Sequence, residues 1–308
     1  MSGSAQIRHN QLKSKLLTSI AHGVTQAEHI GTKVFPIVQE TQKNLEVPIF
    51  GTDAFTSVST KRAPGAPPAQ GTSQQVTTIP VQLIEYAYEE FIDRQETEDG
   101  DLFNLKKAKS RNALQKVLNG REINIANKVN DYASYGSDNK ETLTTTDQWT
   151  HADSNPFEQI MDGKTTIEKK LGVTVNTLTL GAESWNALFK NVKLRKEIID
   201  ARIGLVTIET IKQILEIENL FVGKAIDTVA GVNSFVWKDN AVLSYTTTNK
   251  NPNKFDPSFG FTFQRKGHPY ITESQDRNGN IDFYTAYLQY AAEVISYDAA
   301  YIFKDTNG

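Results

Sequence analysis

Histidine, serine and acidic residues are the side chains of this sequence that could carry catalysis or bind a metal. The five histidines are scattered through the chain and form no cluster with metal-ligand spacing, so no metal site is predicted. The chain has no cysteine, which excludes disulfides, thiolate ligands and cysteine nucleophiles. Glycine-rich phosphate loops, zinc-protease motifs and nucleophile elbows are also missing.

Two short stretches come closest to a functional site. Ser184 follows a predicted strand, but the glycine spacing of a nucleophile elbow is missing, so a strand-to-helix turn capped by Ser184 is the favoured interpretation. Residues 276–282 alternate oxygen-bearing side chains as a calcium loop does, yet the glycine is displaced and the distal glutamate is absent. A hairpin turn at Asn278 and Gly279 explains that stretch better. The sequence therefore predicts no enzyme, no cofactor and no metal.

Length and charge further limit the classes of protein to which the chain could belong. The 308 residues suffice for one large or two modest lobes. The chain carries 33 basic and 36 acidic residues, so it lacks the basic excess of a dedicated nucleic-acid binder. No apolar run approaches the roughly 18 residues that cross a bilayer, and the N-terminus lacks a secretory pattern. We therefore expect neither a membrane partner nor secretion.

Residues 46–91 are the part of the chain least able to fold alone. Two β-rich arms enclose a segment rich in proline and glycine, which opposes both helix and regular strand pairing. A two-stranded ribbon is only marginally stable in water, so its apolar side chains should need cover from the rest of the chain or from another copy. The residues expected to meet that cover are Phe50, Phe55, Tyr86 and Tyr88 on the arms, and Lys61, Arg62 and Pro64 at the tip.

The remaining sequence predicts helices and strands in alternation. A long helix is expected over 102–132, with its lysines and arginines interpreted as a solvated face. Residues 11–20 predict a short helix in an N-terminal arm, and residues 133–153 a loop. Residues 155–245 combine helices with short strands and predict an α/β lobe, in which Gly172 should end one helix and Thr207 should cap the start of another. The tail is β-rich.

The order of arm, ribbon, long helix, lobe and β-rich tail resembles the major capsid proteins of tailed bacteriophages, which share the HK97-type shell fold. The segments that carry the resemblance are Phe50 to Phe55 leading into Arg62-Ala63-Pro64-Gly65, Asn176 to Leu188, Val206 to Ala225, Val236 to Tyr245, Ser258 to Phe263, and Asp298 to Tyr301. The resemblance implies an α+β fold: N-arm at 1–45, extended hairpin (E-loop) at 46–92, P-domain with a long spine helix at 93–176 and 256–297, and mixed α/β A-domain at 177–255 and 298–308.

The resemblance also implies a function in assembly. Hexamers and pentamers would close into an icosahedral shell around double-stranded phage DNA, built in the host bacterial cytoplasm and retained in the virion. A portal and a decoration protein belong to the implied partners, and the DNA contact would not be sequence-specific. Because the ribbon begins near residue 46, no room is left for a fused scaffolding segment, so a separate scaffolding protein is expected. The contact between subunits would use the seven E-loop residues named above.

Two alternatives stay open at this point. An encapsulin-type bacterial nanocompartment shell would share the fold. A conventional α/β enzyme is disfavoured by the absent motifs and by the protruding ribbon. A lysine–asparagine crosslink of the kind that one capsid subgroup makes is not expected, because Lys61 is the one lysine of the ribbon and no partner is identified.

Overall fold

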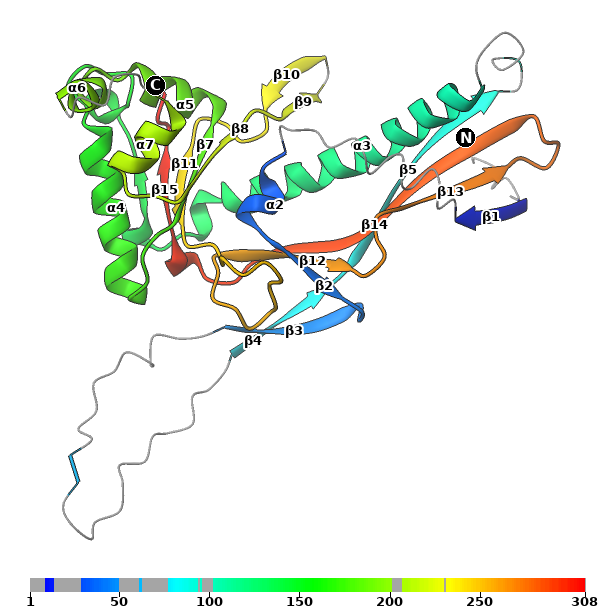
Figure 1. Cartoon of the computed structure of the whole chain (residues 1–308), viewed down its shortest axis with the longest axis horizontal. Helices are drawn as coiled ribbons and strands as arrows, with labels where there is room; N and C mark the ends of the chain where they lie inside the picture. The colour runs from blue at the N-terminus through cyan, green and yellow to red at the C-terminus, as the bar shows by residue number, and fades with distance from the viewer. Residues whose placement is uncertain are drawn as a thin grey trace.

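Two sheets joined by a long helix organise the chain (Figure 1). The computed structural model describes residues 9–13, 29–49, 61–62, 77–93, 95, 102–200, 207–229 and 231–307. One sheet and the long helix beside it form an elongated part of the molecule. The second sheet belongs to a compact lobe, which lies at one end of that helix.

Strand β14 is the centre of the elongated part. One of its edges pairs first with β13 and then with β12, and its other edge pairs with β5 over ten residues. β12 continues to β2, and β13 to β1. The strands of this long sheet are β1 (His9–Lys13), β2 (Ile37–Glu40), β5 (Ile84–Asp93), β12 (Gly260–Arg265), β13 (Tyr270–Gln275) and β14 (Ile281–Val294). The turn between β13 and β14 holds Gly279 at φ +70°, which confirms the hairpin predicted there.

Helix α3 (Leu102–Val129) lies along one face of the long sheet, as Figure 1 shows. Its apolar stripe, including Leu114 and Val117, packs into one core with Tyr284 and Leu288 of β14. This confirms the predicted long helix and its buried face.

The prediction that the basic residues of α3 form a solvated face is wrong for Lys106 and Lys109, which are half-buried, whereas Lys128 is exposed and is also paired with an acidic residue. Lys106 pairs with Glu273 at 3.0 Å, Lys109 with Glu90 at 3.4 Å, and Lys128 with Glu293 at 2.8 Å. Long lysine side chains that flank an apolar stripe can lay their methylenes on it and reach acidic groups on the strands beside it. The helix is therefore fixed to the sheet along its length.

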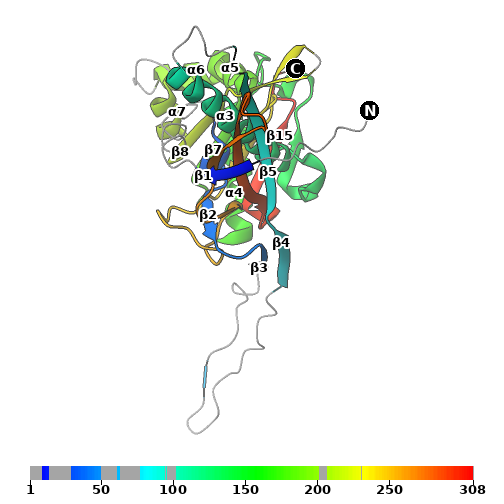
Figure 2. The same ribbon diagram turned by 90° about the vertical axis from the view of Figure 1, so that its right-hand side faces the viewer.

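The ribbon of β3 (Asn44–Ile49) and β4 (Thr77–Gln82) packs on the sheet face opposite to α3 (Figure 2). Val47, Val81 and Leu83 share a core with Phe261 and Phe263. The base of the ribbon is therefore covered by the rest of its own chain, which is the first of the two kinds of cover expected from the sequence. The second arm also divides, because the chain after Leu83 leaves the ribbon and pairs with β14 as β5.

The compact lobe contains a five-stranded sheet in the order β6-β15-β11-β7-β8. Its strands are β6 (Lys140–Thr142), β7 (Thr177–Gly181), β8 (Asn219–Gly223), β11 (Ala241–Ser244) and β15 (Ala300–Lys304), and its helices are α4 (Pro156–Leu171), α5 (Ala182–Lys190), α6 (Val192–Asp200) and α7 (Ile208–Ile214). Gly172 ends α4 at φ 63°, and Thr207 Oγ1 accepts a hydrogen bond from Thr210 N at 3.2 Å at the start of α7. Both helix boundaries were predicted from these residues.

Three local predictions are corrected. Residues 11–13 belong to strand β1 rather than a helix, because pairing with β13 satisfies their backbone groups. Residues 133–153 are not one loop, since β6 joins the lobe sheet beside β15 and Trp149 is fully buried in its core. Ser184 does not cap α5. Its hydroxyl is buried and donates to the carbonyl of Asn240 at 3.0 Å.

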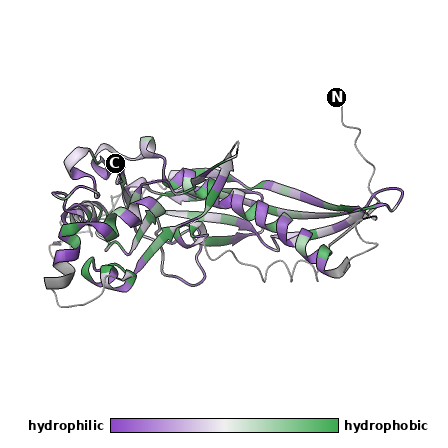
Figure 3. Cartoon of the chain, turned by 90° about the horizontal axis from the view of Figure 1, so that it is seen from above, coloured by the Kyte–Doolittle hydropathy of each residue, from purple (hydrophilic) through white to green (hydrophobic). Residues whose placement is uncertain are grey.

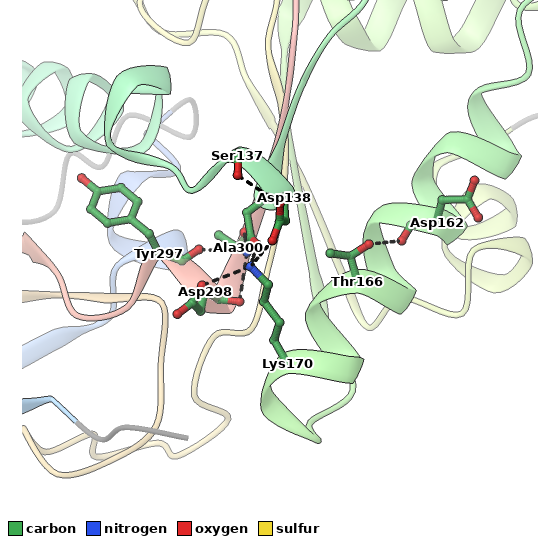
Figure 4. A network of polar contacts seen from close by, with 9 residues as sticks. Ser137, Asp138, Asp162, Thr166, Lys170, Tyr297, Asp298 and Ala300 are labelled. Atoms are coloured by element: carbon green, nitrogen blue, oxygen red, sulfur yellow. Dashed lines mark hydrogen bonds and ion pairs between the residues drawn. The ribbon is translucent and has the colours of Figure 1, made fainter. Parts of the chain in front are cut away.

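Asn139 fixes the segment before β6 to the segment before β15. Its buried amide nitrogen donates to the carbonyl oxygens of Tyr297, Asp298 and Ala300 at 3.3, 3.3 and 2.9 Å. Its amide oxygen accepts from Lys170 Nζ, which also lies 3.5 Å from a carboxylate oxygen of Asp298 (Figure 4). Every polar atom of this side chain is therefore used.

We expect Asn139→Asp to lower the free energy of unfolding by about 2 kcal/mol, because an acceptor would face three carbonyl oxygens in place of a donor. Burial raises the pKa of such a carboxyl, so the loss should shrink as the pH falls and the carboxyl regains a proton to donate. Chemical denaturation at acidic and neutral pH measures this. Asp138→Asn, beside it on an exposed side chain, is the control and should change stability by less than about 0.5 kcal/mol. An equal loss at both pH values would contradict the prediction.

Candidate assembly interface

Glu122 is the point where three parts of the chain meet. It lies in α3, and its carboxylate is buried. Oε1 accepts from the backbone N–H of Ile30 at 2.9 Å and from Trp237 Nε1 at 2.8 Å, while Oε2 accepts from the backbone N–H of Gly31 at 2.9 Å. The donors belong to the start of the short helix α2 (Gly31–Val34) and to the segment before β11. One carboxylate thus connects the N-terminal segment, the long helix and the lobe.

Close packing surrounds this junction. A Cβ on Gly31 would lie 2.6 Å from Glu122 Oε2, so only glycine fits there without movement. A Cβ on Gly223 would lie 2.2 Å from the Trp237 ring, and one on Gly181 would lie 1.7 Å from the Lys238 carbonyl oxygen. Gly181 and Gly223 pair at the ends of β7 and β8, and their bare backbone leaves space for the segment that carries Trp237.

Strand β5 presents the best candidate surface for contact with another copy. It pairs with β14 on one edge, and none of the strands that the structure describes pairs with its other edge. Ile84, Tyr86 and Tyr88 lie on the face that also carries α3, and they are 54%, 36% and 42% exposed. An unpaired strand edge with a row of apolar side chains favours association with another chain.

A cavity of about 590 Å³ lies between the start of β5, the end of β14 and the last turns of α3. Ile84, Tyr86 and Tyr290 form its apolar wall, and Asn124, Asn127 and Asp131 are among its polar lining residues. The Tyr86 and Tyr290 rings lie 4.8 Å apart, and Asn124 Nδ2 donates to the Tyr290 hydroxyl at 2.6 Å. Burial raises the pKa of Tyr290 well above its ordinary value, so this hydroxyl stays protonated and the wall uncharged.

The predicted contact residues fall in different places. Tyr86 and Tyr88 were assigned to the ribbon but lie on β5 in the long sheet, because their strand finds a ten-residue partner in β14. Lys61 and Arg62 are exposed. Phe50, Phe55 and Pro64 lie outside the described residues, and the role of all seven in subunit contact stays a prediction.

Sequence reasoning missed two exposed apolar surfaces. Ile84 and Phe91 of β5 are more exposed than the tyrosines between them, and Phe91 is 55% exposed. The hairpin of β9 (Ile226–Val229) and β10 (Val232–Phe235) stands apart as a two-stranded sheet, with Val232 69% exposed. The alternation of β5 marks it as a strand but does not say which of its faces stays uncovered.

Sites for other chemistry are not visible in the described part of the chain. Its histidine and acidic side chains form no group of three that could hold a metal ion. Asp276, in the calcium-like stretch, instead accepts from the backbone N–H groups of Asn280 and Ile281 at 2.7 and 3.1 Å. Among the same residues, none of the helices has the length and apolar character needed to cross a bilayer.

Comparison with known proteins shows the family to which the chain belongs. The family model described as phage major capsid protein E matches residues 111–254. The chain is 30% identical to the major capsid protein of Burkholderia phage BcepMu over 298 residues, which is 95% of this chain and 96% of that protein. The chain belongs to the family of phage major capsid proteins. A second major capsid protein, from Pseudomonas phage JBD67, is 30% identical over 111 residues, or 35% of each chain.

Solved structures agree with this capsid-protein family. A phage-related protein from Bordetella bronchiseptica RB50 superposes with a TM-score of 0.80 and 25% identity over 97% of this chain and 99% of that chain. The mature capsid of bacteriophage PhiM1 matches with a TM-score of 0.58 and 11% identity, over 98% of this chain and 91% of that chain. At that identity the match concerns the fold. The predicted HK97-type α+β capsid fold is therefore confirmed.

For a capsid protein, the relevant chemistry is association between copies. A shell is built from many copies of one chain, so an exposed apolar strand on a subunit is a candidate contact with a neighbouring copy. The chain is accordingly a shell-forming component of a virion.

Proposed function

We propose that this capsid protein assembles as hexamers and pentamers into a closed icosahedral shell around double-stranded phage DNA. It acts by association and not by catalysis. The free edge and apolar row of β5 receive a neighbouring copy, and the ribbon tip with Lys61 and Arg62 reaches a second neighbour.

The observation that carries this proposal is the exposure of Ile84, Tyr86 and Tyr88 beside an unpaired strand edge. Water is an unfavourable environment for this row, at about 25 cal/mol per Å² of apolar surface left uncovered. A neighbour that covers the row removes that cost and can also pair with the free edge. Membership of a shell-forming family supports this assignment of the open surface.

Other partners belong to the same proposal. A portal, a separate scaffolding protein and a decoration protein are the further components that a closed DNA-filled head would use, with assembly in the host bacterial cytoplasm. The ribbon and the N-terminal segment would adapt to the different angles of hexamers and pentamers, while the two packed cores stay rigid.

Electron microscopy of the purified chain tests the proposal. We expect closed icosahedral shells, with or without an added scaffolding protein, and interiors large enough for a phage genome. The double variant Ile84→Ser with Tyr88→Ser should reduce the yield of closed shells at least tenfold, because two exposed contacts become polar. Phe255→Ser, which removes an exposed ring from a loop of the described chain, is the matched control and should leave the yield unchanged.

A folded monomer that never assembles would contradict the proposal. So would a β5 double variant that assembles as well as the control. Small shells filled with a protein cargo would instead support the nanocompartment alternative.

A further inference from the structure

The hairpin of β9 and β10 projects beside the lobe (Figure 1). Its two strands pair with each other and with no further strand of the described chain. Residues 231–235 are all exposed, and Ile226 and Val232 are 52% and 69% exposed. A two-stranded sheet with uncovered apolar side chains is only marginally stable in water. The hairpin is therefore a surface that favours a partner.

The base of the hairpin is fixed to the rest of the chain. The backbone N–H of Val236 donates to the carbonyl oxygen of Ala225 at 2.9 Å, and both residues are buried. Trp237, the next residue, is buried and donates to Glu122. The hairpin is thus presented from a fixed position, which lowers the entropic cost of binding a partner.

The first half of β5 is open in the same way. Residues 84–88 are exposed without interruption, whereas Ile92 near the end of the strand is buried. Because successive side chains of a strand point to opposite faces, an unbroken exposed run leaves both faces of that stretch open. Figure 3 shows from above how polar and apolar segments alternate along the strands of the long sheet. The open stretch is long enough to pair with all four residues of β10.

The hairpin and the open stretch of β5 lie on different flanks of α3. Asn119 lines a cavity of about 160 Å³ at the base of the hairpin, together with Ile226. Asn124 lines the cavity beside β5, together with Tyr86. Side chains five residues apart leave a helix about 140° apart. The two surfaces therefore face in different directions.

Each surface also carries one acid and one cation that form no ion pair with any described residue. On the hairpin side these are Lys224, just before β9, and Asp227 within it. On the β5 side they are Glu85 and Lys238, which lines the same cavity as Tyr86. The charges of the two surfaces are thus complementary.

We propose that β10 of one copy pairs with the free edge of β5 in the next copy, so that the hairpin extends the long sheet of its neighbour. This inference rests on the proposed shell and names the part of the neighbour that β5 receives. The two strands run antiparallel, with Val232 opposite Tyr88 and Phe235 opposite Glu85. A strand added at an edge contributes side chains to both faces of the sheet, which suits two surfaces that are open on both faces.

This register also brings the opposite charges together. Lys224 at the base of the hairpin lies beside Glu85 of the next copy. Asp227 is the pairing partner of Ser234, so it shares a face with Val232. That face continues the face of Tyr86 and Tyr88 in the neighbour, where Lys238 lines the cavity.

The contact is head-to-tail, because the hairpin and the β5 edge are different surfaces of one chain. Head-to-tail contacts close into a ring when the rotation between copies permits it. A hexamer and a pentamer differ in that rotation and use the same pair of surfaces. One hairpin contact therefore serves both kinds of ring.

Cysteine crosslinking tests the register, because the chain has no cysteine of its own. The double variant Val232→Cys with Tyr88→Cys places two thiols opposite each other across the subunit boundary, within reach of a disulfide. Oxidised glutathione added to assembled shells should give a ladder of linked chains that ends at pentamers and hexamers on a denaturing gel. The two single variants, mixed before assembly, should give linked dimers and nothing longer.

The matched control is Val192→Cys with Tyr88→Cys, since Val192 of α6 is also an exposed valine, at 62%. It should give no ladder. Linked dimers from Val232→Cys alone would overturn the inference, because the hairpins would then meet each other. Shells that give no ladder, even with a flexible bis-maleimide in place of the oxidant, would overturn this inference alone. A native chain that forms no shells would count against the proposed function on which it rests.

Charge reversal tests the same contact in chains without cysteine. Lys224→Glu and Glu85→Lys should each lower the yield of closed shells about fivefold, because like charges would face each other in every contact. The double variant restores opposite charges and should restore the yield. Thermal unfolding of all three should match the native chain, since both side chains are exposed. Losses that add in the double variant, or native yields in both single variants, would contradict the pairing.

Discussion

Glu122→Ala should lower the free energy of unfolding by about 4 kcal/mol, because three buried N–H donors would lose their acceptor at once. For a chain of this size, such a loss corresponds to a fall in Tm of about 8 °C. Thermal and chemical unfolding of the purified chain measure it. Glu122→Gln keeps one acceptor oxygen but turns an NH₂ group toward a donor, so we expect an intermediate loss of about 2 kcal/mol.

The control for this series is Glu218→Gln, which neutralises an exposed glutamate of the lobe. It should change stability by less than about 0.5 kcal/mol. If Glu122→Ala were as stable as this control, the three hydrogen bonds could not be holding the junction together. Increased proteolysis near Ile30 in the alanine variant would further show that the N-terminal segment has been released.

Deletion of Pro64 through Gly71 should abolish closed shells and leave the isolated chain folded. The cores of the described chain use β3 and β4 at the base of the ribbon and the strands beyond it. The deleted segment is rich in proline and glycine, which oppose regular strand pairing. Its removal should therefore eliminate a contact with a neighbouring subunit and change the stability of the isolated subunit little. Electron microscopy reports shells, and thermal unfolding reports the subunit.

A replacement of the same residues by a glycine–serine segment of equal length is the matched control for this deletion. If reach alone matters, the replacement restores shells, and if the residues themselves make the contact, it does not. Normal assembly of the deleted chain would remove the ribbon tip from the interface.

The sequence predicted local elements better than it predicted their partners. Helical periodicity located α3, and Gly172 and Thr207 located the ends of helices, because each signal depends on residues within one or two turns. The sequence predicted β4 and β5 as one continuous arm, since apolar residues alternate in both. Only the ten-residue match with β14, almost two hundred positions later, separates them. Pairing at that distance leaves no local pattern in the chain.

The exposed apolar side chains of β5 were anticipated only in part, for the same reason. Tyr86 and Tyr88 were predicted to need cover and are exposed on β5, but Ile84 and Phe91 were not singled out, because exposure depends on which face of β5 is covered. The sequence did not show that Glu122 connects three parts of the chain. A glutamate in the middle of a lysine-rich helix resembles any surface acid until Trp237 and Gly31 are placed beside it.

The shared acceptor at Glu122 also makes two distant parts of the chain thermodynamically reciprocal. A neighbour that draws Ile30 and Gly31 away from the carboxylate would weaken the packing of Trp237 at the junction. By linkage, a neighbour that moves the lobe would weaken the binding of the N-terminal segment by the same free energy. A neighbouring copy that contacts either part would therefore be coupled to the other part through this one carboxylate.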